Sequence, residues 1–244
     1  MINQVAFTIG NLSINWYGII FALSFLIAIP ISVKLGKQRN ITKQNIYDYF
    51  LYLIPSSVIG ARLMAVILNF HLYQDNLLKI FYIWEGGMAF HGGLIGAIIG
   101  TYFFCKKYKI HFYDIADIIV IPVALGLSIG RIGNFINQEF PGRFTTLPWG
   151  ITYENIQGKR HPSQIYESIK NFIIFLILLN FYKIKNLKKG TIFWFFILLY
   201  SLFRFLVEFV KEQQLLFLNL TYGQLISIPL LILAVIMLTK IGKK

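Results

Sequence analysis

The chain has 244 residues, of which 57% are hydrophobic, 17% aromatic and only 14% charged, and its mean hydropathy is +0.64. Soluble domains carry about 25% charged residues, so this composition excludes an ordinary soluble protein and indicates an integral membrane protein. The net charge of +13 comes from Lys and Arg dispersed over separate connections, which argues against a nucleic-acid-binding face.

Seven stretches are long enough to cross a hydrocarbon core of about 30 Å as helices of about 20 residues. In chain order they cover residues 14–35, 47–68, 88–108, 114–132, 164–182, 190–210 and 222–240. We expect the first to be retained, because no basic segment precedes it and no small-residue cleavage site follows it. Pro122 predicts a kink in the fourth. Continuous apolar stretches favour helices over a membrane β-barrel, so we predict an all-α bundle of seven transmembrane helices.

The connections between these stretches are short, except one of about residues 133–163. We therefore predict a single polytopic domain over residues 1–244, with the long connection covering one face of the bundle.

The connections also divide into two sets that differ in Lys and Arg content. One set holds fourteen: Lys34, Lys37, Arg39, Lys43, Lys106, Lys107, Lys109, Lys183, Lys185, Lys188, Lys189, Lys240, Lys243 and Lys244. The other holds six: Lys79, Arg131, Arg143, Lys159, Arg160 and Lys211. The positive-inside rule then predicts an outer N-terminus and a cytoplasmic C-terminus, with anionic membrane lipids near the basic ends.

With this orientation, nearly all unusual polar side chains of the spans fall in the outer leaflet. A charge at the bilayer centre costs about 3 kcal/mol, so such residues indicate a site, and we expect one cavity open to the outside. The set comprises Tyr17, Arg62, His91, Arg131, Asn134, Gln164, Tyr166, Glu167, Arg204, Glu208 and Gln224. Asp48, Asp114 and Asp117 lie instead at inner N-terminal helix ends, where the helix dipole accounts for carboxylates.

Several of these residues also have a purely structural explanation. Arg204 and Glu208 are four residues apart and could form an ion pair within one helix. His91 could be a satisfied polar residue at a helix end, and Tyr17 could belong to an interfacial aromatic belt. The convergence of such residues from separate helices favours a functional site.

Glycines of the third stretch suggest close helix packing. Gly92, Gly96 and Gly100 recur every four residues, the small-xxx-small pattern that lets helix backbones approach. Gly92 and Gly93 adjoin His91, where they could let a lipid head group approach the backbone.

Other chemistry is not supported by its context. A G-x-S-x-G pattern at residues 126–130 lies within an apolar helix rather than at a strand-to-helix turn, so Ser128 is not expected to be a nucleophile. The single Cys105 lies at the inner end of the third stretch and is expected to be inert. The four histidines lack metal-ligand spacing, so no metal and no other cofactor is predicted.

Arg131 and Arg204 at head-group depth suit a phosphate, because a guanidinium donates paired, charge-assisted hydrogen bonds to its oxygens. If the phosphate is the leaving group, they would also stabilise the charge that develops on it. His91 could accept a proton from an attacking group. No residue of this chain suits the attack itself, so the nucleophile is expected from a second substrate.

Residues 130–142, GRIGNFINQEFPG, resemble the signature of the bacterial prolipoprotein diacylglyceryl transferases. The resemblance continues at residues 16–18 (WYG), 86–93 (GGMAFHGG), 161–167 (HPSQIYE), 204–209 (RFLVEF) and 223–229 (GQLISIP). It implies seven membrane helices in the bacterial cytoplasmic (inner) membrane and an active site facing the outer leaflet. It implies transfer of a diacylglyceryl group from phosphatidylglycerol to the lipobox cysteine of a prolipoprotein signal peptide, with release of glycerol phosphate.

Carried over by position, the resemblance makes Arg131 the phosphatidylglycerol-binding arginine and Arg204 its essential partner. We assign to catalysis Tyr17, His91, Arg131, Arg204 and Glu208. We assign to phosphatidylglycerol binding Gly92, Gly93, Arg131, Asn134, Glu139, Gly142 and Arg204. The base role of His91 is a hypothesis. The sequence departs from the family's pattern at two places in the outer loops. Gln138 stands where the family often has a small residue, and residues 211–214, KEQQ, lack the family's usual proline and aspartate.

Two other function classes fit parts of the pattern. A transporter or channel would use Arg204, Glu208 and His91 along a pathway, but the polar residues do not continue into the inner halves of the spans. Inverted repeats of interrupted helices, typical of transporters, are not apparent. A sensor or structural membrane protein would lack covalent chemistry altogether.

Overall fold

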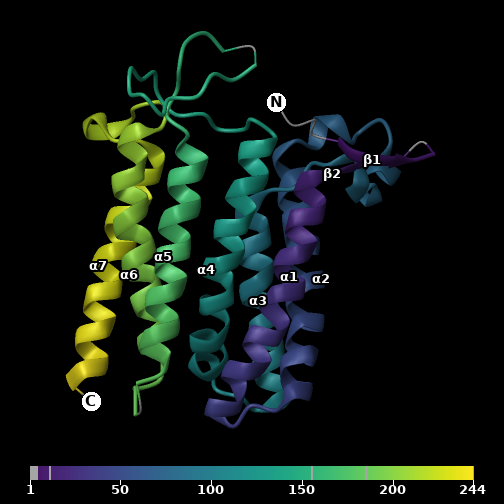
Figure 1. Ribbon diagram of the computed structural model, residues 1–244. Helices are drawn as coiled ribbons and strands as arrows, with labels where there is room; N and C mark the ends of the chain where they lie inside the picture. The colour runs from purple at the N-terminus through teal and green to yellow at the C-terminus, as the bar shows by residue number, and fades with distance from the viewer. Residues whose placement is uncertain (1–4, 11, 155, 185, 244) are drawn as a thin grey trace. The chain divides into compact units, whose positions relative to one another are not determined.

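The computed structural model describes residues 5–10, 12–154, 156–184 and 186–243, and in them seven α-helices follow a short hairpin (Figure 1). The helices are α1 Trp16–Gly36, α2 Lys43–Leu68, α3 Phe90–Tyr108, α4 Phe112–Ile136, α5 Ser163–Tyr182, α6 Thr191–Val207 and α7 Tyr222–Lys243. Six of these described helices are long and apolar enough to cross a membrane. The exception is α3, whose apolar residues are diluted by four glycines, His91 and two lysines in its last turn.

The hairpin precedes α1 and was not predicted from the sequence. Strands β1 (Val5–Ile9) and β2 (Leu12–Asn15) pair in antiparallel register, and α1 begins directly afterwards at Trp16. The apolar residues of β2 merge with those of α1 in the sequence, so hydropathy alone does not separate a four-residue strand from the helix that follows. The prediction of a helical membrane protein is confirmed, with this small sheet added.

The chain forms two compact units, Val33–Ile115 on the one hand and Met1–Ser32 with Ala116–Lys244 on the other. In the first unit, α2 and α3 pack so closely that the glycines at their contact have no room for a side chain. A Cβ on Gly92 would overlap the carbonyl oxygen of Gly60, and one on Gly96 would overlap that of Ser56. The predicted role of the glycine repeat in helix packing is therefore confirmed.

Arg62 of α2 serves the connection between α2 and α3. Its side chain is buried, and all three guanidinium nitrogens donate to backbone carbonyl oxygens. The donor–acceptor distances are 2.8 Å from Nε to Ile80, 2.5 and 3.1 Å from Nη1 to Gly86 and Gly87, and 2.5 and 3.3 Å from Nη2 to Lys79 and Tyr82. An arginine has five N–H groups, so these bonds use its full donor capacity. Arg62 therefore holds its own connection together instead of presenting a free cation to a cavity.

In the second unit, helices α5, α6 and α7 lie side by side (Figure 1). Asp117, in the second turn of α4, is fully buried and accepts hydrogen bonds of 2.8 Å from the backbone N–H groups of Gly190 and Phe193. This carboxylate caps the start of α6, where the positive end of the helix dipole favours it. The helix-dipole explanation predicted for Asp117 is confirmed, but the helix it serves is α6.

Ser128 lies in the second half of the same α4 and is a packing residue. Its hydroxyl donates to the carbonyl oxygen of Ser168 at 2.8 Å, and the Ser168 hydroxyl donates back to the Ser128 carbonyl at 2.9 Å. Both residues are buried within helices, so Ser128 lacks the exposed turn that a nucleophilic serine requires, as predicted.

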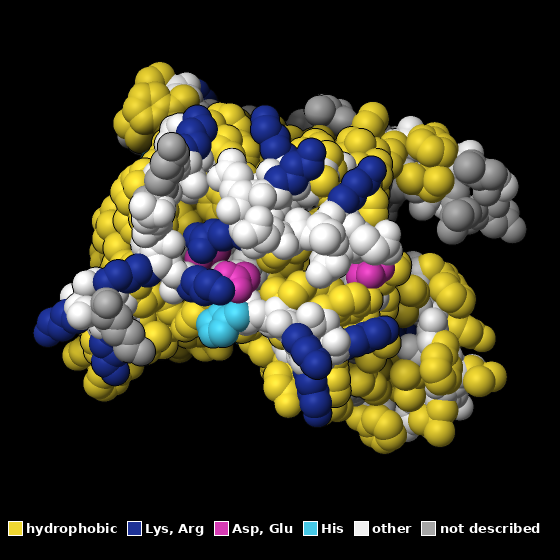
Figure 2. All heavy atoms as spheres, turned by 90° about the horizontal axis from the view of Figure 1, so that it is seen from below, with side chains coloured by type: hydrophobic (Ala, Val, Ile, Leu, Met, Phe, Trp, Pro, Cys, Tyr) yellow, Lys and Arg dark blue, Asp and Glu magenta, His cyan; other side chains and the backbone are white. Residues whose placement is uncertain are grey.

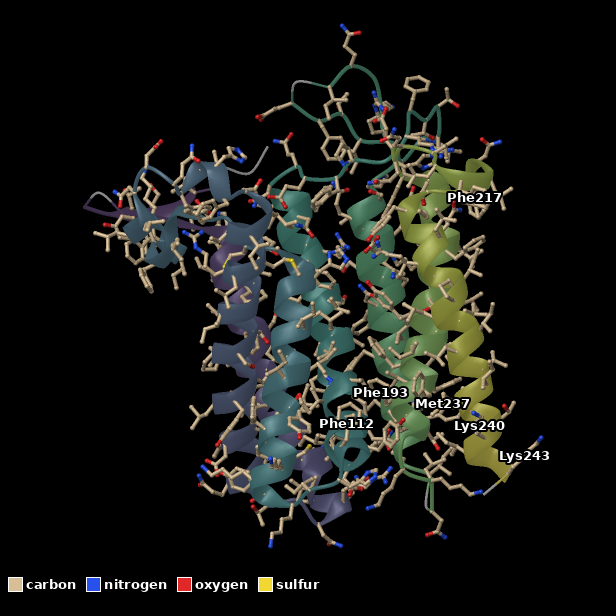
Figure 3. All side chains as sticks on the ribbon, turned by 180° about the vertical axis from the view of Figure 1, so that it is seen from behind. Phe112, Phe193, Phe217, Met237, Lys240 and Lys243 are labelled. Carbon is tan, nitrogen blue, oxygen red and sulfur yellow. The ribbon has the colours of Figure 1, made fainter. Side chains whose placement is uncertain are left out.

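Basic residues gather at one end of α7. Lys240 and Lys243 project from its last turns, opposite the end near Phe217, which lies in the short 3-10 helix Phe217–Asn219 (Figure 3). Figure 2 shows broad hydrophobic areas in which Lys and Arg side chains form separate groups, as expected for a membrane protein with basic ends. Lys185 and Lys244 of the predicted basic set lie outside the described residues.

Replacing Arg62 should destabilise the connection between α2 and α3. We expect Arg62→Met to lower the free energy of unfolding by about 3 kcal/mol, because several buried carbonyl groups lose a charged donor. Arg62→Lys should recover only part of the lost stability, since an ammonium has a single nitrogen and cannot reach all five carbonyl groups. The measurements are apparent Tm in detergent and the rate of proteolysis within residues 69–89. Lys106→Met, at an exposed lysine, serves as control, and equal results for it and Arg62→Met would contradict the assigned role.

Candidate active site

The signature residues gather where α4 ends. This helix continues to Ile136, four residues beyond the predicted end, so Arg131 and Asn134 share its final turns. The Arg131 Nη1 lies 3.3 Å from the Asn134 Oδ1 and donates to it. Tyr17 of α1 packs at the same place, because a Cβ added to Gly133 would lie 2.9 Å from the Cδ2 of its ring. The structure thus brings Arg131 and Asn134 together and places Tyr17 beside Gly133 at the same helix end.

Glu167 of α5 is the centre of the charges at this end of the unit. Its side chain is 1% exposed, and its Oε2 lies 2.6 Å from the Nε of Arg131. Its other oxygen forms an ion pair with the ammonium of Lys211. Lys211 follows α6 and is also paired with Glu208, whose Oε2 lies 3.3 Å from the Lys211 Nζ. One buried carboxylate is therefore shared by cations from two distant parts of the sequence.

Glu208 is fixed in place by the helix next to it. Its side chain is 3% exposed and lies against Gly223 of α7, where an added Cβ would overlap the carboxylate. Glycine is required here because a charged group occupies the space of a side chain.

Arg204 has no carboxylate within ion-pair distance among the described residues. Its Nη1 donates a long hydrogen bond of 3.4 Å to the hydroxyl of Tyr200. The structural alternative, a pair between Arg204 and Glu208 within α6, is wrong, because Glu208 pairs with Lys211. Arg204 therefore remains available to an anion from outside the chain.

Glu139 organises the start of the long connection. Its carboxylate accepts from the side-chain amides of Asn134, at 2.6 Å, and Asn137, at 3.2 Å. The side chain of Gln164 donates to its carbonyl oxygen at 2.5 Å. On either side of it, Gln138 and Phe140 have φ of +58° and +55°, a conformation that side chains disfavour. This backbone explains why a small residue at position 138 would suit the turn.

Gly142 lies in a space that no other residue fits. A Cβ there would lie 2.6 Å from the Val210 carbonyl oxygen and 2.7 Å from that of His161. Its neighbour Arg143 donates from Nε to the carbonyl oxygen of Lys211 at 2.8 Å. The close approach of the connection to the segment after α6 therefore requires glycine, whatever contact Gly142 makes with a substrate.

A pocket of about 180 Å³ opens within this unit. It is lined by Arg131, Phe140, Pro141, Arg204, Glu208, Lys211, Gln213, Tyr222 and Gly223. A larger groove of about 950 Å³ lies along α2 and α3 in the other unit, but apolar residues line most of it. The small pocket has the cations that a phosphate needs, and it is far too small for two acyl chains.

His91, Gly92 and Gly93 belong to the unit of α2 and α3. His91 is exposed at the start of α3, with its ring 5.7 Å from that of Phe90. Gly92 is buried against α2, so packing alone accounts for the absence of its side chain. Their roles in catalysis and lipid binding remain predictions.

Three residues of the cluster were not assigned a role from the sequence. The sequence predicts only a position in a connection for Lys211, and it predicts no role for Lys170 or Tyr200. The sequence does contain a signal for Lys170, since Arg62, Lys170 and Arg204 are the only Lys or Arg residues that lie more than four residues from either end of a predicted span. Glu167 was noted as a polar residue of α5, but its two cationic partners were not predicted.

Comparison with known proteins gives a consistent result over nearly the full length. Residues 4–240 match the family model described as prolipoprotein diacylglyceryl transferase. The phosphatidylglycerol–prolipoprotein diacylglyceryl transferase of Finegoldia magna is 39% identical over 242 residues, which cover 99% of this chain and 97% of that protein. The protein of the same name from Geobacter sulfurreducens is 38% identical, with coverage of 100% and 96%. That of Rickettsia rickettsii is 40% identical, with coverage of 95% and 94%.

Neutralising Glu167 should weaken both the fold and the site. Glu167→Gln leaves Arg131 and Lys211 without their shared counter-charge, and loss of one partner of a buried ion pair costs about 3–5 kcal/mol. We expect a lower apparent Tm in detergent and a large loss of activity. Glu212→Gln is a matched control, because Glu212 is 59% exposed in its pair with Arg160 and should contribute less than about 1 kcal/mol. Equal effects of the two substitutions would contradict the central role of Glu167.

Proposed function

Because the chain belongs to the prolipoprotein diacylglyceryl transferase family, we propose that its charged pocket binds the phosphate of phosphatidylglycerol. The chain is an integral membrane enzyme that transfers the diacylglyceryl group of phosphatidylglycerol to a prolipoprotein. The transporter alternative is not supported by the relatives.

The observation that carries the phosphate proposal is the unequal pairing of charges around the pocket. Arg131, Arg204 and Lys211 supply three positive charges, whereas the carboxylates that contact them are Glu167 and Glu208. Among the described cations that line the pocket, Arg204 is the one without a carboxylate within ion-pair distance. A phosphodiester carries one negative charge. A planar guanidinium can donate two parallel hydrogen bonds to phosphate oxygens, which makes it the suitable partner.

The chemistry of transfer follows from this placement. The thiol of the prolipoprotein's lipobox cysteine attacks the diacylglyceryl carbon that is bonded to a phosphate oxygen. A C–S bond forms, the C–O bond breaks, and its electron pair remains on the phosphate of the departing glycerol phosphate. Arg131 and Arg204 stabilise the charge that grows on this oxygen, while the thiol proton passes to a base, for which His91 is the candidate.

The same proposal includes the arrangement in the membrane. Hydropathy and the excess of Lys and Arg in one set of connections support seven spans in one polytopic domain, with an outer N-terminus and a cytoplasmic C-terminus. The pocket then faces the outer leaflet of the bacterial inner membrane, where Tyr17, Asn134, Glu139, Gly142 and Glu208 complete the site with the two arginines. The long connection of about residues 133–163 covers this face.

Transfer can be measured directly with phosphatidylglycerol labelled in its diacylglyceryl group and a lipobox peptide. We expect label on the peptide with the natural enzyme and at least about 100-fold less with Arg131→Gln or Arg204→Gln, as for other lost transition-state donors. Arg39→Gln, outside the pocket, is the control and should retain transfer. A peptide with serine in place of cysteine should receive no label. Full lipidation by the double variant, Arg131→Gln with Arg204→Gln, would overturn the phosphate site.

The role of His91 needs a separate measurement. His91→Gln keeps a polar side chain of similar reach but cannot accept a proton in the same way. We expect kcat to fall and the shape of its pH profile to change, because glutamine cannot take up the thiol proton. If both the rate and the pH profile are unchanged, His91 takes no part in proton transfer.

A further inference from the structure

Lys170 is a buried cation in α5, close to the charged pocket but outside its lining. The residue is 5% exposed, and its Nζ has no hydrogen-bond partner among the described residues. The ammonium lies 4.2 Å from the centre of the Tyr200 ring, a distance typical of a cation–π contact. Lys170 follows Glu167 by three residues, which places both on the same face of α5.

The neighbours of Lys170 are mostly of its own sign. Glu167 attracts the ammonium, whereas Arg131, Arg204 and Lys211 repel it. Packing does not call for such a residue, because an apolar side chain of similar length would fill the same space without the cost of burying a charge. A buried, unbonded cation beside three others is unfavourable for the empty enzyme, and it becomes favourable when an anion enters.

Lys170 is also connected to Arg204 through an aromatic ring. Tyr200 lies one turn before Arg204 on α6 and accepts the hydrogen bond from its guanidinium. The ammonium of Lys170 lies over the same ring. The lysine therefore acts on the site in two ways, by its charge and by holding the tyrosine that orients Arg204.

We propose that Lys170 is a positioning residue that tunes the pocket to the doubly charged glycerol phosphate, more than to the singly charged phosphate of the lipid. This inference rests on the proposed phosphate site. When Lys170 is protonated, the four cations Arg131, Lys170, Arg204 and Lys211 face the two carboxylates Glu167 and Glu208, leaving an excess of two positive charges. Glu139 is not counted in this balance, because among the described residues its carboxylate forms no ion pair with these four cations.

An excess of two positive charges matches the charge of the leaving glycerol phosphate better than the charge of the bound lipid. Phosphatidylglycerol brings one negative charge, and breakage of the C–O bond creates a second on the leaving oxygen. Interactions that are stronger with the developing charge than with the bound substrate raise kcat. Because Lys170 is already in place and dry, it exerts this effect without rearrangement during the reaction.

The test compares two ligands that differ in charge. For the natural enzyme and Lys170→Met, the KM for phosphatidylglycerol in mixed micelles and the inhibition constant of glycerol phosphate are measured with the transfer assay. Removal of the lysine charge should weaken binding by about tenfold for each negative charge on the ligand. The inhibition constant of glycerol phosphate should therefore rise by about tenfold more than the KM for phosphatidylglycerol. Lys170→Arg should restore the ratio of the two constants. Lys183→Met, at an exposed lysine just beyond the same helix, should leave it unchanged.

A merely structural role would change both constants by the same factor, and that result, or no change in either, would overturn the inference. Lys170→Gln removes the charge but keeps a polar end group, and it replaces the methionine variant if that one does not accumulate in the membrane. The two proposals fail separately. Retained transfer by the Arg131→Gln and Arg204→Gln variants rejects the phosphate site itself. Loss of transfer in those variants, with an unchanged ratio for Lys170→Met, rejects only the role of Lys170.

Discussion

The pairing of Glu167 with two cations is the interaction on which the charged end of this protein depends. A carboxylate that is 1% exposed requires compensation, and it receives this from Arg131 of α4 and from Lys211 beyond α6. The end of α4 and the segment after α6 therefore meet at α5. Glu208 binds the same lysine and rests against Gly223, which ties α7 to the arrangement. The cluster fixes the positions of the helix ends, and the pocket is the space left beside it.

Two arginines within helices, the buried Arg62 and the partly exposed Arg204, show how structural and functional charges differ. Arg62 directs all three guanidinium nitrogens to backbone carbonyl groups and has no donor left. Arg204 has one long hydrogen bond to a tyrosine and no carboxylate in reach among the described residues. The sequence alone shows two similar residues in apolar surroundings. Arg204 keeps N–H donors that Arg62 has already used, and only the three-dimensional structure reveals this difference.

Long apolar stretches are sufficient to predict the helices, because burial in lipid requires continuous hydrophobic sequence. The same sequence predicts the importance of Arg131 and Arg204, since charges are rare in such stretches. The ion-pair partners of these charged residues could not be predicted in this way. Glu208 and Arg204 have ideal α-helical spacing, yet α6 tightens to a 3-10 turn at Glu208–Val210 and brings Glu208 to Lys211 instead. The sequence shows Lys170 as a cation well inside a predicted span, but its neighbours on other helices are visible only in the structure.

The long connection contacts the segment after α6 at Lys211, a residue whose ammonium belongs to the charged cluster. Gly142 pairs with Lys211 through the backbone, and the Arg143 guanidinium binds the Lys211 carbonyl oxygen. Lys211 is therefore held from two sides, its backbone by the long connection and its ammonium by Glu167 and Glu208. The long connection and the buried carboxylates are thus joined through this residue, so the backbone that crosses the end of the bundle also sets where one of the pocket's cations lies.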